Sequence, residues 1–306
     1  MTHYLLRRIA QAAVTLLVVV TVTFVLGRLS GSPGVILLGD NATPEQIDAF
    51  DAARGFDRPI WEQFLGYLGG VAVGDFGESY RQTGTSSMQL ALERLPASLT
   101  LGAVGLGLGI VLAVLATLAI QVTGSRTLRA VSVALGSLRA AVPDFFFGLL
   151  LVLVFSIGLG WLPSLGNQQP AAIVLPAVTV GTGVYILYTR LLDNAMNEQL
   201  GMDYVKTALA RGDSRLRVTV AEVLPNALLP VLTVAGINVG AVLGGMLIVE
   251  NVFAWPGLGQ LTMNAVYGRD FPVVQASILV VAALFVVTNL VVDLVYMLID
   301  PRVRLS

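Results

Sequence analysis

Few side chains in this sequence could do catalytic chemistry, and their spacing does not suit it. The 306 residues include no cysteine, one histidine (His3) and one lysine (Lys206). A phosphate-cradling loop needs a lysine between glycine and serine or threonine, whereas Lys206 follows a valine. Nucleophilic catalysis needs a base beside a serine on a strained turn, and neither basic residue has one close in sequence. The sequence therefore predicts no enzyme, no cofactor and no metal site in this chain.

Four ionisable residues fall within or beside long apolar segments. Arg139 and Asp144 precede one such segment, Glu250 ends another, and Asp293 lies in the last turns of the final one. Charges in a membrane are costly and indicate function by default. Snorkelling or capping at a segment boundary explains the first three. Asp293 shares a helix face with Asn289, so pairing with a neighbouring helix is favoured over a proton relay.

The elements that would position these residues are transmembrane helices. A hydrophobic content of 56% with only 12% charged residues is too apolar for a soluble domain. Apolar runs long enough to cross a bilayer predict six spans, at residues 9–26, 99–122, 145–161, 171–189, 227–249 and 273–292. Runs this continuous are not barrel strands. We therefore expect an all-α integral membrane protein.

Arginine and lysine placement predicts the orientation of these helices. Basic residues precede the first helix, separate the second from the third, fill residues 193–226 and close the chain, whereas residues 162–170 carry no charge. Both termini and residues 193–226 should therefore be cytoplasmic in a multi-pass inner or plasma membrane protein. The amino end resembles a signal peptide, but its apolar run is long and no cleavage pattern follows, which favours an uncleaved helix.

The predicted organisation has three parts. Residues 1–29 form the N-terminal segment and first span, residues 30–97 an extracytoplasmic helical cap, and residues 98–306 the core. The cap is favoured over a mere connector because of its length, and its aromatic residues Trp61, Phe64 and Tyr67 argue against disorder. Near-neutral net charge gives no sign of a nucleic-acid partner.

Residues 193–226 are the long charged stretch between two apolar segments, and they read as a helix–turn–helix outside the bilayer. Gly212 can take the left-handed conformation that ends a helix, and Asp213 or Ser214 can cap the next one. After the turn, an apolar face is expected at helical spacing, comprising Leu216, Val220, Val223 and Leu224. A solvated loop with incidental helicity is the alternative.

The predicted fifth span carries Gly236, Gly240 and Gly244 at every fourth position. Small residues at this spacing let two membrane helices approach closely, so helix packing is favoured over pore lining. The second span has a looser set, Gly102, Gly105 and Gly109, for which packing is expected.

The sequence resembles the inner-membrane permeases of binding-protein-dependent ABC importers, specifically the first of the two permeases in the dipeptide/oligopeptide branch. The motifs that carry this resemblance span almost the whole chain. They include Gly74-Asp75-Phe76-Gly77, Glu93-Arg94-Leu95-Pro96, Val142-Pro143-Asp144-Phe145, Glu250-Asn251-Val252-Phe253-Ala254-Trp255-Pro256-Gly257 and Asp300-Pro301-Arg302.

The resemblance implies the type I ABC importer permease fold and makes residues 193–226 the EAA-type coupling segment. In that family a short helix before a glycine inserts into a groove on the ATPase subunit. Thr207 stands where the family usually has glutamate, so docking by shape through Tyr204, Ala208 and Leu209 is expected. The coupling residues implied are Tyr204, Lys206, Thr207, Ala208, Leu209, Arg211, Gly212 and Asp213.

The resemblance also implies the partners. They are a homologous second permease, two ATPase domains that bind ATP and Mg²⁺, an extracytoplasmic solute-binding protein, membrane lipid and a di- or oligopeptide substrate, moved by alternating access. Nickel chelates, glutathione or another small solute are alternative cargoes, and a self-sufficient channel or ion-coupled carrier is a remote alternative. Candidate residues of the translocation path are Phe145, Tyr185, Tyr188, Asn238 and Met246.

Overall fold

The computed structural model describes residues 2–29, 31–39, 42–53 and 55–299, and the regular elements within these ranges are helices. The chain divides into two compact units, one of residues 1–96 and 257–287 and one of residues 97–256 and 288–306. Residues 257–287 thus group with the N-terminal part of the chain, whereas the sequence placed them in a single core of residues 98–306. The predicted all-helical architecture is confirmed.

Several helices are long and apolar enough to cross a membrane. Among the described residues these are Arg7–Leu29, Ser87–Thr123, Pro170–Leu200 and Phe271–Val291, and the bent pair Arg126–Ala141 with Asp144–Gly158 would be a fifth. The remaining expected span, residues 227–249, lies within the 29-residue helix α11, Leu224–Val252. These helices match the positions of the six predicted spans.

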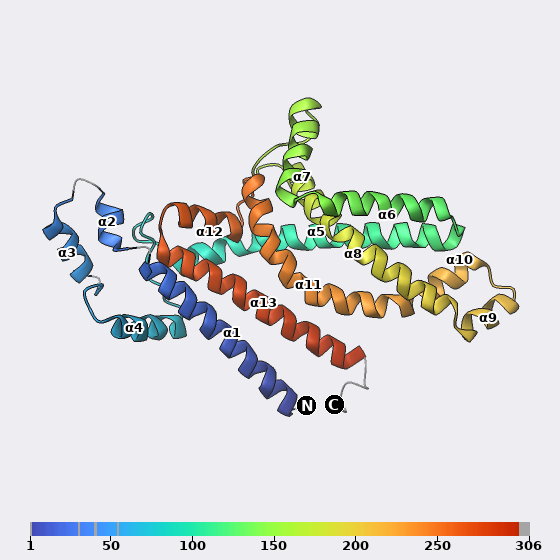
Figure 1. The fold of residues 1–306 in the computed structure, drawn as a ribbon, viewed down its shortest axis with the longest axis horizontal. Coiled ribbons are helices and arrows are strands. Elements are labelled where there is room, and N and C mark those ends of the chain that lie inside the picture. The colour runs from blue at the N-terminus through green and yellow to red at the C-terminus, as the bar shows by residue number, and fades with distance from the viewer. Residues whose placement is uncertain (1, 30, 40–41, 54, 300–306) are drawn as a thin grey trace. The chain divides into compact units, whose positions relative to one another are not determined.

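The first unit contains the long helix α1, most of the long helix α13 and several shorter helices (Figure 1). In chain order it holds α1 (Thr2–Leu29), α2 (Pro33–Leu38), α3 (Pro44–Ala53), α4 (Ile60–Val73), the first part of α5 (Ser87–Thr123), α12 (Leu258–Tyr267) and most of α13 (Phe271–Ile299). Helix α3 begins with a reciprocal cap, because Thr43 and Gln46 exchange bonds between backbone N–H and side-chain oxygen. The aromatic rings of α4 pack on α1, with Phe64 and Tyr67 at 5.1 and 5.5 Å from Phe24.

One buried carboxylate fixes the loop between α4 and α5. Asp270, 3% exposed, accepts hydrogen bonds from the Ser79 hydroxyl and from the backbone N–H groups of Tyr80 (3.0 Å) and Arg81 (3.3 Å). A buried charge is stable only when several donors replace its hydration. Residues 75–86 are therefore held against the turn between α12 and α13, although they form no regular helix.

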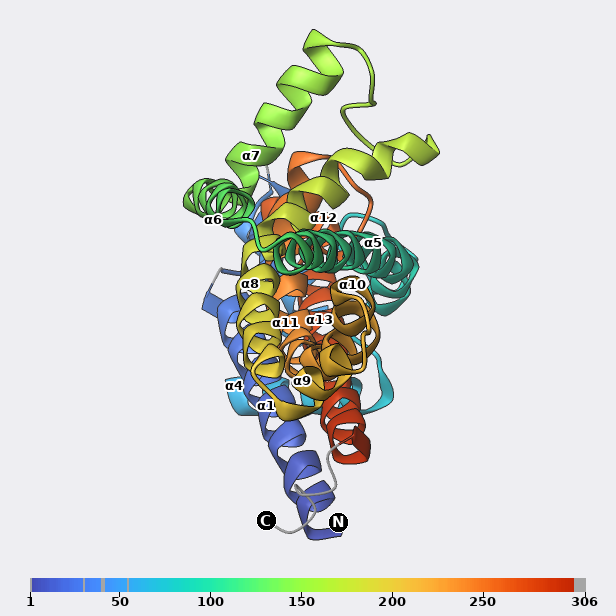
Figure 2. The same cartoon turned by 90° about the vertical axis from the view of Figure 1, so that its right-hand side faces the viewer.

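The second unit is a helical bundle built on α5, α8 and α11. Its elements are the rest of α5, α6 (Arg126–Ala141), α7 (Asp144–Leu151), the π-helix η1 (Val152–Gly158), the 3₁₀ turn η2 (Pro170–Ile173), α8 (Val174–Leu200), α9 (Asp203–Ala210), α10 (Arg215–Val218), the π-helix η3 (Thr219–Val223) and α11. Helix α6 runs antiparallel to α5 (Figure 1) and packs against α8, and α7 with η1 then projects away from the bundle (Figure 2).

The sharp turn between α6 and α7 follows from a proline. Pro143 disfavours helical geometry at the preceding residue, and Val142 is extended with φ −99° and ψ 123°. The axes of α6 and of α7 with η1 consequently differ by 104°. Residues 126–141 lie outside the predicted spans because Arg126, Arg129 and Arg139 interrupt their hydropathy, yet they form the regular helix α6.

Glycines of α5 permit a close approach to α8. A Cβ atom at Gly109 would lie 2.4 Å from Val184 Cγ2 and 2.5 Å from the Gly181 carbonyl oxygen, and one at Gly105 would lie 2.8 Å from Val180. Neither position can accept a side chain unless the helices separate. The packing role predicted for these two glycines is thus confirmed.

Substituting Gly109 by leucine should destabilise the protein by about 1–3 kcal/mol, because overpacking forces backbone shifts. The matched control is Gly107→Leu on the same helix, where a Cβ atom would meet nothing within 4 Å among the described residues. Thermal unfolding in detergent should show a lowered Tm for the first variant and little change for the second. Equal Tm values would contradict the close α5–α8 contact.

Candidate functional site

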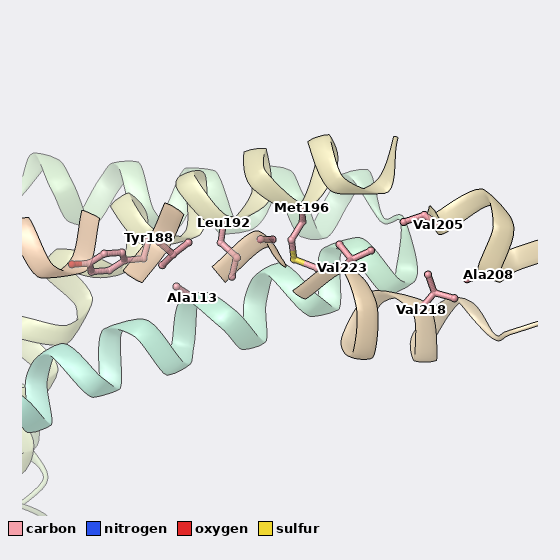
Figure 3. Packing of buried hydrophobic residues seen from close by; sticks show 10 residues of the cluster. Ala113, Tyr188, Leu192, Met196, Val205, Ala208, Val218 and Val223 are labelled. Atoms are coloured by element: carbon pink, nitrogen blue, oxygen red, sulfur yellow. The ribbon is translucent and has the colours of Figure 1, made fainter. Parts of the chain in front are cut away.

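The short helix α9 sits on a buried apolar cluster of the second unit. Figure 3 shows this cluster running from α5 and α8 to α9, α10 and η3. Val205 and Ala208, one turn apart on α9, are 2% and 0% exposed and face the cluster. Burying a valine side chain such as that of Val205 contributes roughly 1.5–3 kcal/mol, so α9 is anchored by its inner face.

The turn after α9 has the geometry expected from its glycine. Gly212 has a φ of +88°, and its N–H donates to the Leu209 carbonyl at 3.0 Å while the Asp213 N–H donates to the Ala208 carbonyl at 3.3 Å. This pair of bonds is a Schellman motif, which satisfies the last carbonyls of a helix. The Ser214 hydroxyl then accepts from the Arg217 N–H at 3.3 Å and caps α10. The predicted helix stop and N-cap are confirmed.

The apolar face predicted after the turn is wrong in part. Val218, Thr219 and Val223 are buried, whereas Leu216 and Val220 are exposed. The physical reason is the π-helix η3, whose wider turn shifts the register between α10 and α11. It ends at Val223, two residues before Pro225, which lacks the N–H needed to continue an α-helical ladder.

Four exposed or half-exposed charges cross-link the segment. Arg211 lies 3.8 Å from Glu222 and 4.0 Å from Asp213, and Arg217 lies 3.4 Å from Asp213. Exposed pairs contribute little individually, but this network joins the end of α9 to α10 and η3. The segment is therefore fixed by an apolar cluster beneath and an ionic network at its surface.

The outward face of α9 differs from the docking face that was expected. Ala208 is fully buried beneath the helix, so direct docking through its side chain is corrected to a positioning role. Tyr204 is half-buried and donates to Gln199 Oε1 at 2.9 Å. The exposed residues are Lys206, which pairs with Asp203 at 2.8 Å, Thr207, whose hydroxyl donates to the Asp203 carbonyl, and Leu209, 47% exposed.

A cavity of about 410 Å³ lies between the α6–α7 bend, α8 and α11. These elements correspond to the predicted third, fourth and fifth spans. Most of the lining is apolar, and its polar side chains are Arg139, Asp144 and Asn238. Gly183 of α8 leaves room for the first two, since a Cβ atom there would lie 3.2 Å from Asp144 Oδ1 and 3.4 Å from Arg139 Nη2.

The buried side chain of Arg139 holds the α6–α7 bend together and does not extend toward a membrane surface. It is 9% exposed, and it donates to Asp144 Oδ1 at 2.6 Å, the Thr179 carbonyl at 2.9 Å, Thr182 Oγ1 at 3.0 Å and the Val142 carbonyl at 3.0 Å. Its guanidinium also lies 4.2 Å from the centre of the Phe147 ring. The boundary explanation offered for Arg139 is therefore wrong, since this side chain ties α6, α7 and α8 together.

Of the five path candidates, the structure places two on the cavity. Asn238 and Met246 line it. Tyr188 is fully buried in the apolar cluster beneath α9. The Tyr185 hydroxyl is hydrogen-bonded to the Ser132 hydroxyl at 2.6 Å on the α6–α8 interface. Phe145 is exposed on α7. The sequence did not single out the residues around Arg139 as candidates for the path. They line the cavity because Arg139 pairs with Asp144 across the α6–α7 bend.

The structure tests the predictions for the remaining membrane charges and glycines to different extents. Glu250 lies near the end of α11 as expected, but it is 1% exposed and accepts a hydrogen bond from Ser98 Oγ at 2.5 Å, so snorkelling does not explain it. The side chain of Asp293 lies outside the described residues. A Cβ atom at Gly244 would meet nothing within 4 Å in the described part of the chain, so the packing role of Gly236, Gly240 and Gly244 stays a prediction.

Comparison with known families gives matches over almost the whole chain. Residues 109–305 match the binding-protein-dependent transport system inner membrane component, and residues 1–102 match the N-terminal region of the same kind of membrane component. The chain is 34% identical to the glutathione transport system permease protein GsiC of Salmonella choleraesuis strain SC-B67, and 33% identical to GsiC of Escherichia coli strain K12. Each alignment covers 305 residues and 99% of both proteins.

The fold is similar to that of a solved importer. Two inward-facing structures of the MetNI methionine ABC transporter align with a TM-score of 0.58 at 17% and 22% identity, covering 70% of this chain and 97% of theirs. ATP hydrolysis in this family resides in partner subunits, and no cofactor belongs to the permease. The chain belongs to the family of binding-protein-dependent transport system inner membrane components and is a multi-pass permease subunit of an ABC importer.

Proposed function

We propose that this permease carries di- or oligopeptides inward by alternating access, as one half of a pore completed by a homologous second permease. Two cytoplasmic ATPase domains drive it, and an extracytoplasmic binding protein delivers the solute. Both chain termini and residues 193–226 are cytoplasmic in this proposal, with residues 30–97 as the extracytoplasmic cap. The observation that carries it is α9, a helix anchored on its inner face with an exposed outer face.

The anchoring of α9 suits the transmission of force. A helix whose inner face is part of the bundle core moves with that bundle as a rigid body, whereas a flexible loop would absorb the displacement. Closure of the ATPase domains would reach α8 through Val205 and Ala208, and η3, which leads into α11, through the Arg211–Glu222 pair of the ionic network. The cavity beside the α6–α7 bend would be the part of the path that this motion opens and closes.

The exposed apolar surface of the projecting helices α7 and η1 supports the proposal that a second permease packs against this chain. Its exposed side chains are apolar on more than one side, among them Phe145, Phe146, Leu149, Leu153 and Ile157. One side can face lipid, and the other can pack against the homologous subunit. Apolar membrane surfaces of this kind associate through close packing, for which the stripe Gly236, Gly240 and Gly244 is a second candidate.

Glutathione is a second candidate cargo, because the relatives at 33% and 34% identity are named glutathione transport permeases. Glutathione is itself a small peptide, so one cavity chemistry serves both proposals. The binding protein decides between them, and mass spectrometry of the ligand retained by the co-purified binding protein should identify the cargo.

Reconstitution tests the proposed function. Purified permease should co-purify with its ATPase partners, and proteoliposomes holding the whole complex should accumulate peptide only with ATP and the binding protein. The chain alone should give no uptake. Transport by the chain alone would contradict the proposal and favour a self-sufficient channel or an ion-coupled carrier.

A further inference from the structure

In the cavity beside the α6–α7 bend, the polar atoms that can still form hydrogen bonds include more acceptors than donors. Arg139 supplies the charged donors, and four of its five N–H groups are already used by Thr182, Val142, Thr179 and Asp144. The guanidinium therefore has little left to offer an anionic ligand. Its charge is also balanced by the Asp144 carboxylate at 2.6 Å.

Asp144 has acceptor capacity that its own chain does not use. Its side chain is 48% exposed and lines the cavity, and within the described residues its hydrogen-bond partner is Arg139 through one oxygen. An ionised carboxylate can accept about four hydrogen bonds. The second oxygen is therefore available to a donor entering the cavity.

Asn238 of α11 adds a neutral acceptor to the cavity lining. Its amide nitrogen donates to the Val234 carbonyl at 2.9 Å, a bond that only the nitrogen can make. The amide oxygen is left with two lone pairs, and none of the side chains that the structure describes donates to it. The second N–H of the Asn238 amide and one N–H of Arg139 stay available as donors, so the unused capacity of the cavity, on α7 and on α11, is mainly that of acceptors.

We infer that this cavity is a binding site for the backbone amide N–H groups of the transported solute, which Asp144 and Asn238 accept as hydrogen bonds. Because Arg139 and Asp144 cancel in charge, the site favours neutral N–H donors over anions and over side chains of either charge. The apolar remainder of the lining gives contact without selecting one side chain. The inference rests on the proposed function and names the chemical feature of a peptide that the permease itself recognises.

Two probes separate amide N–H recognition from recognition of the rest of the peptide. Triglycine has peptide N–H groups, whereas trisarcosine carries methyl groups on the same nitrogens. Saturation-transfer NMR with the permease–ATPase complex in nanodiscs measures weak binding in the absence of the binding protein, so the selectivity of that protein does not interfere. Triglycine should bind on the order of fivefold more tightly than trisarcosine, as expected for the loss of a neutral hydrogen bond.

The variant that tests the site is Asn238→Leu. It should weaken triglycine binding on the order of fivefold and leave trisarcosine unchanged, so the two dissociation constants converge. The control is Asn251→Leu on the same helix. Its amide likewise donates to the carbonyl four residues earlier, Leu247, and it does not line the cavity. This control should keep the wild-type preference.

A second variant tests the charge balance. Asp144→Asn keeps an acceptor for Arg139 but gives the cavity a positive charge, so it should weaken binding of trilysine several-fold more than binding of triglycine. Equal binding of triglycine and trisarcosine to the wild type, no binding of either, or an unchanged preference in Asn238→Leu would each overturn the inference. ATP-dependent uptake by the same complex with its binding protein is a separate measurement. Its presence leaves the proposed function standing when the cavity inference fails, and its absence removes the proposed function itself.

Discussion

Replacing Gly212 by valine should abolish ATP-dependent uptake by the assembled importer while leaving the permease inserted in the membrane. A β-branched residue is a poor fit at a φ of +88°, where the cost is roughly 1–3 kcal/mol. The chain would relieve that strain by releasing the two bonds that end α9, from Gly212 to Leu209 and from Asp213 to Ala208. The outer face of α9 would then no longer be presented at a fixed angle.

Uptake and ATP hydrolysis should be measured together in proteoliposomes. Uptake should fall by at least about 100-fold, equivalent to about 2.7 kcal/mol of lost coupling, while basal ATP hydrolysis continues without stimulation by the binding protein. Gly212→Asn is the rescue variant, because asparagine tolerates the left-handed conformation. Gly201→Ala, at φ −77°, controls for a glycine loss near the other end of α9. Normal uptake by Gly212→Val would remove the coupling role from this segment.

Replacing Arg139 by methionine should give the largest loss of stability of any single change at the α6–α7 bend. Methionine keeps much of the apolar volume but removes the partners of Asp144, Thr182 and the carbonyls of Val142 and Thr179. Breaking a buried pair costs about 3–5 kcal/mol, and we expect about 2–3 kcal/mol because Asp144 is half-exposed.

The matched control is Arg190→Met on the facing helix α8. Arg190 is exposed and donates one hydrogen bond to Ser137 at 2.9 Å, so its loss should change stability by less than about 0.5 kcal/mol. Thermal unfolding of both variants in the same detergent should show a lower Tm for Arg139→Met alone. Similar Tm values for the two variants would show that Arg139 does not hold the bend.

The hydrogen bonds that end α9 and cap α10 could be predicted from the sequence. Gly212 and Ser214 act on residues within five positions of themselves, so their roles as helix stop and helix cap needed no knowledge of the fold. The same holds for the apolar segments, whose length and lack of charge fix them as membrane helices wherever they pack. The family resemblance extended these local readings to the coupling segment.

The face of a helix was harder to predict than its existence. Leu216 and Val220 were expected to be buried at α-helical spacing, but the π-helix before Pro225 rotates them outward. Ala208 was expected to dock on a partner and instead packs on its own bundle. In both cases the decisive quantity is the direction in which neighbouring elements lie, which hydropathy along one segment does not contain.

By itself, the sequence determined the helical class, the positions of the spans, the absence of catalytic groups and the stop at Gly212, because each depends on composition or on bonds between near neighbours. Only the tertiary structure decided that Arg139 and Glu250 are buried, that α6 is a helix bent 104° from α7, and that Asn238 shares a cavity with Asp144. Residues 144 and 238 are brought together by packing between distant segments, and the free energy of a paired buried charge depends on partners that sequence separation does not reveal.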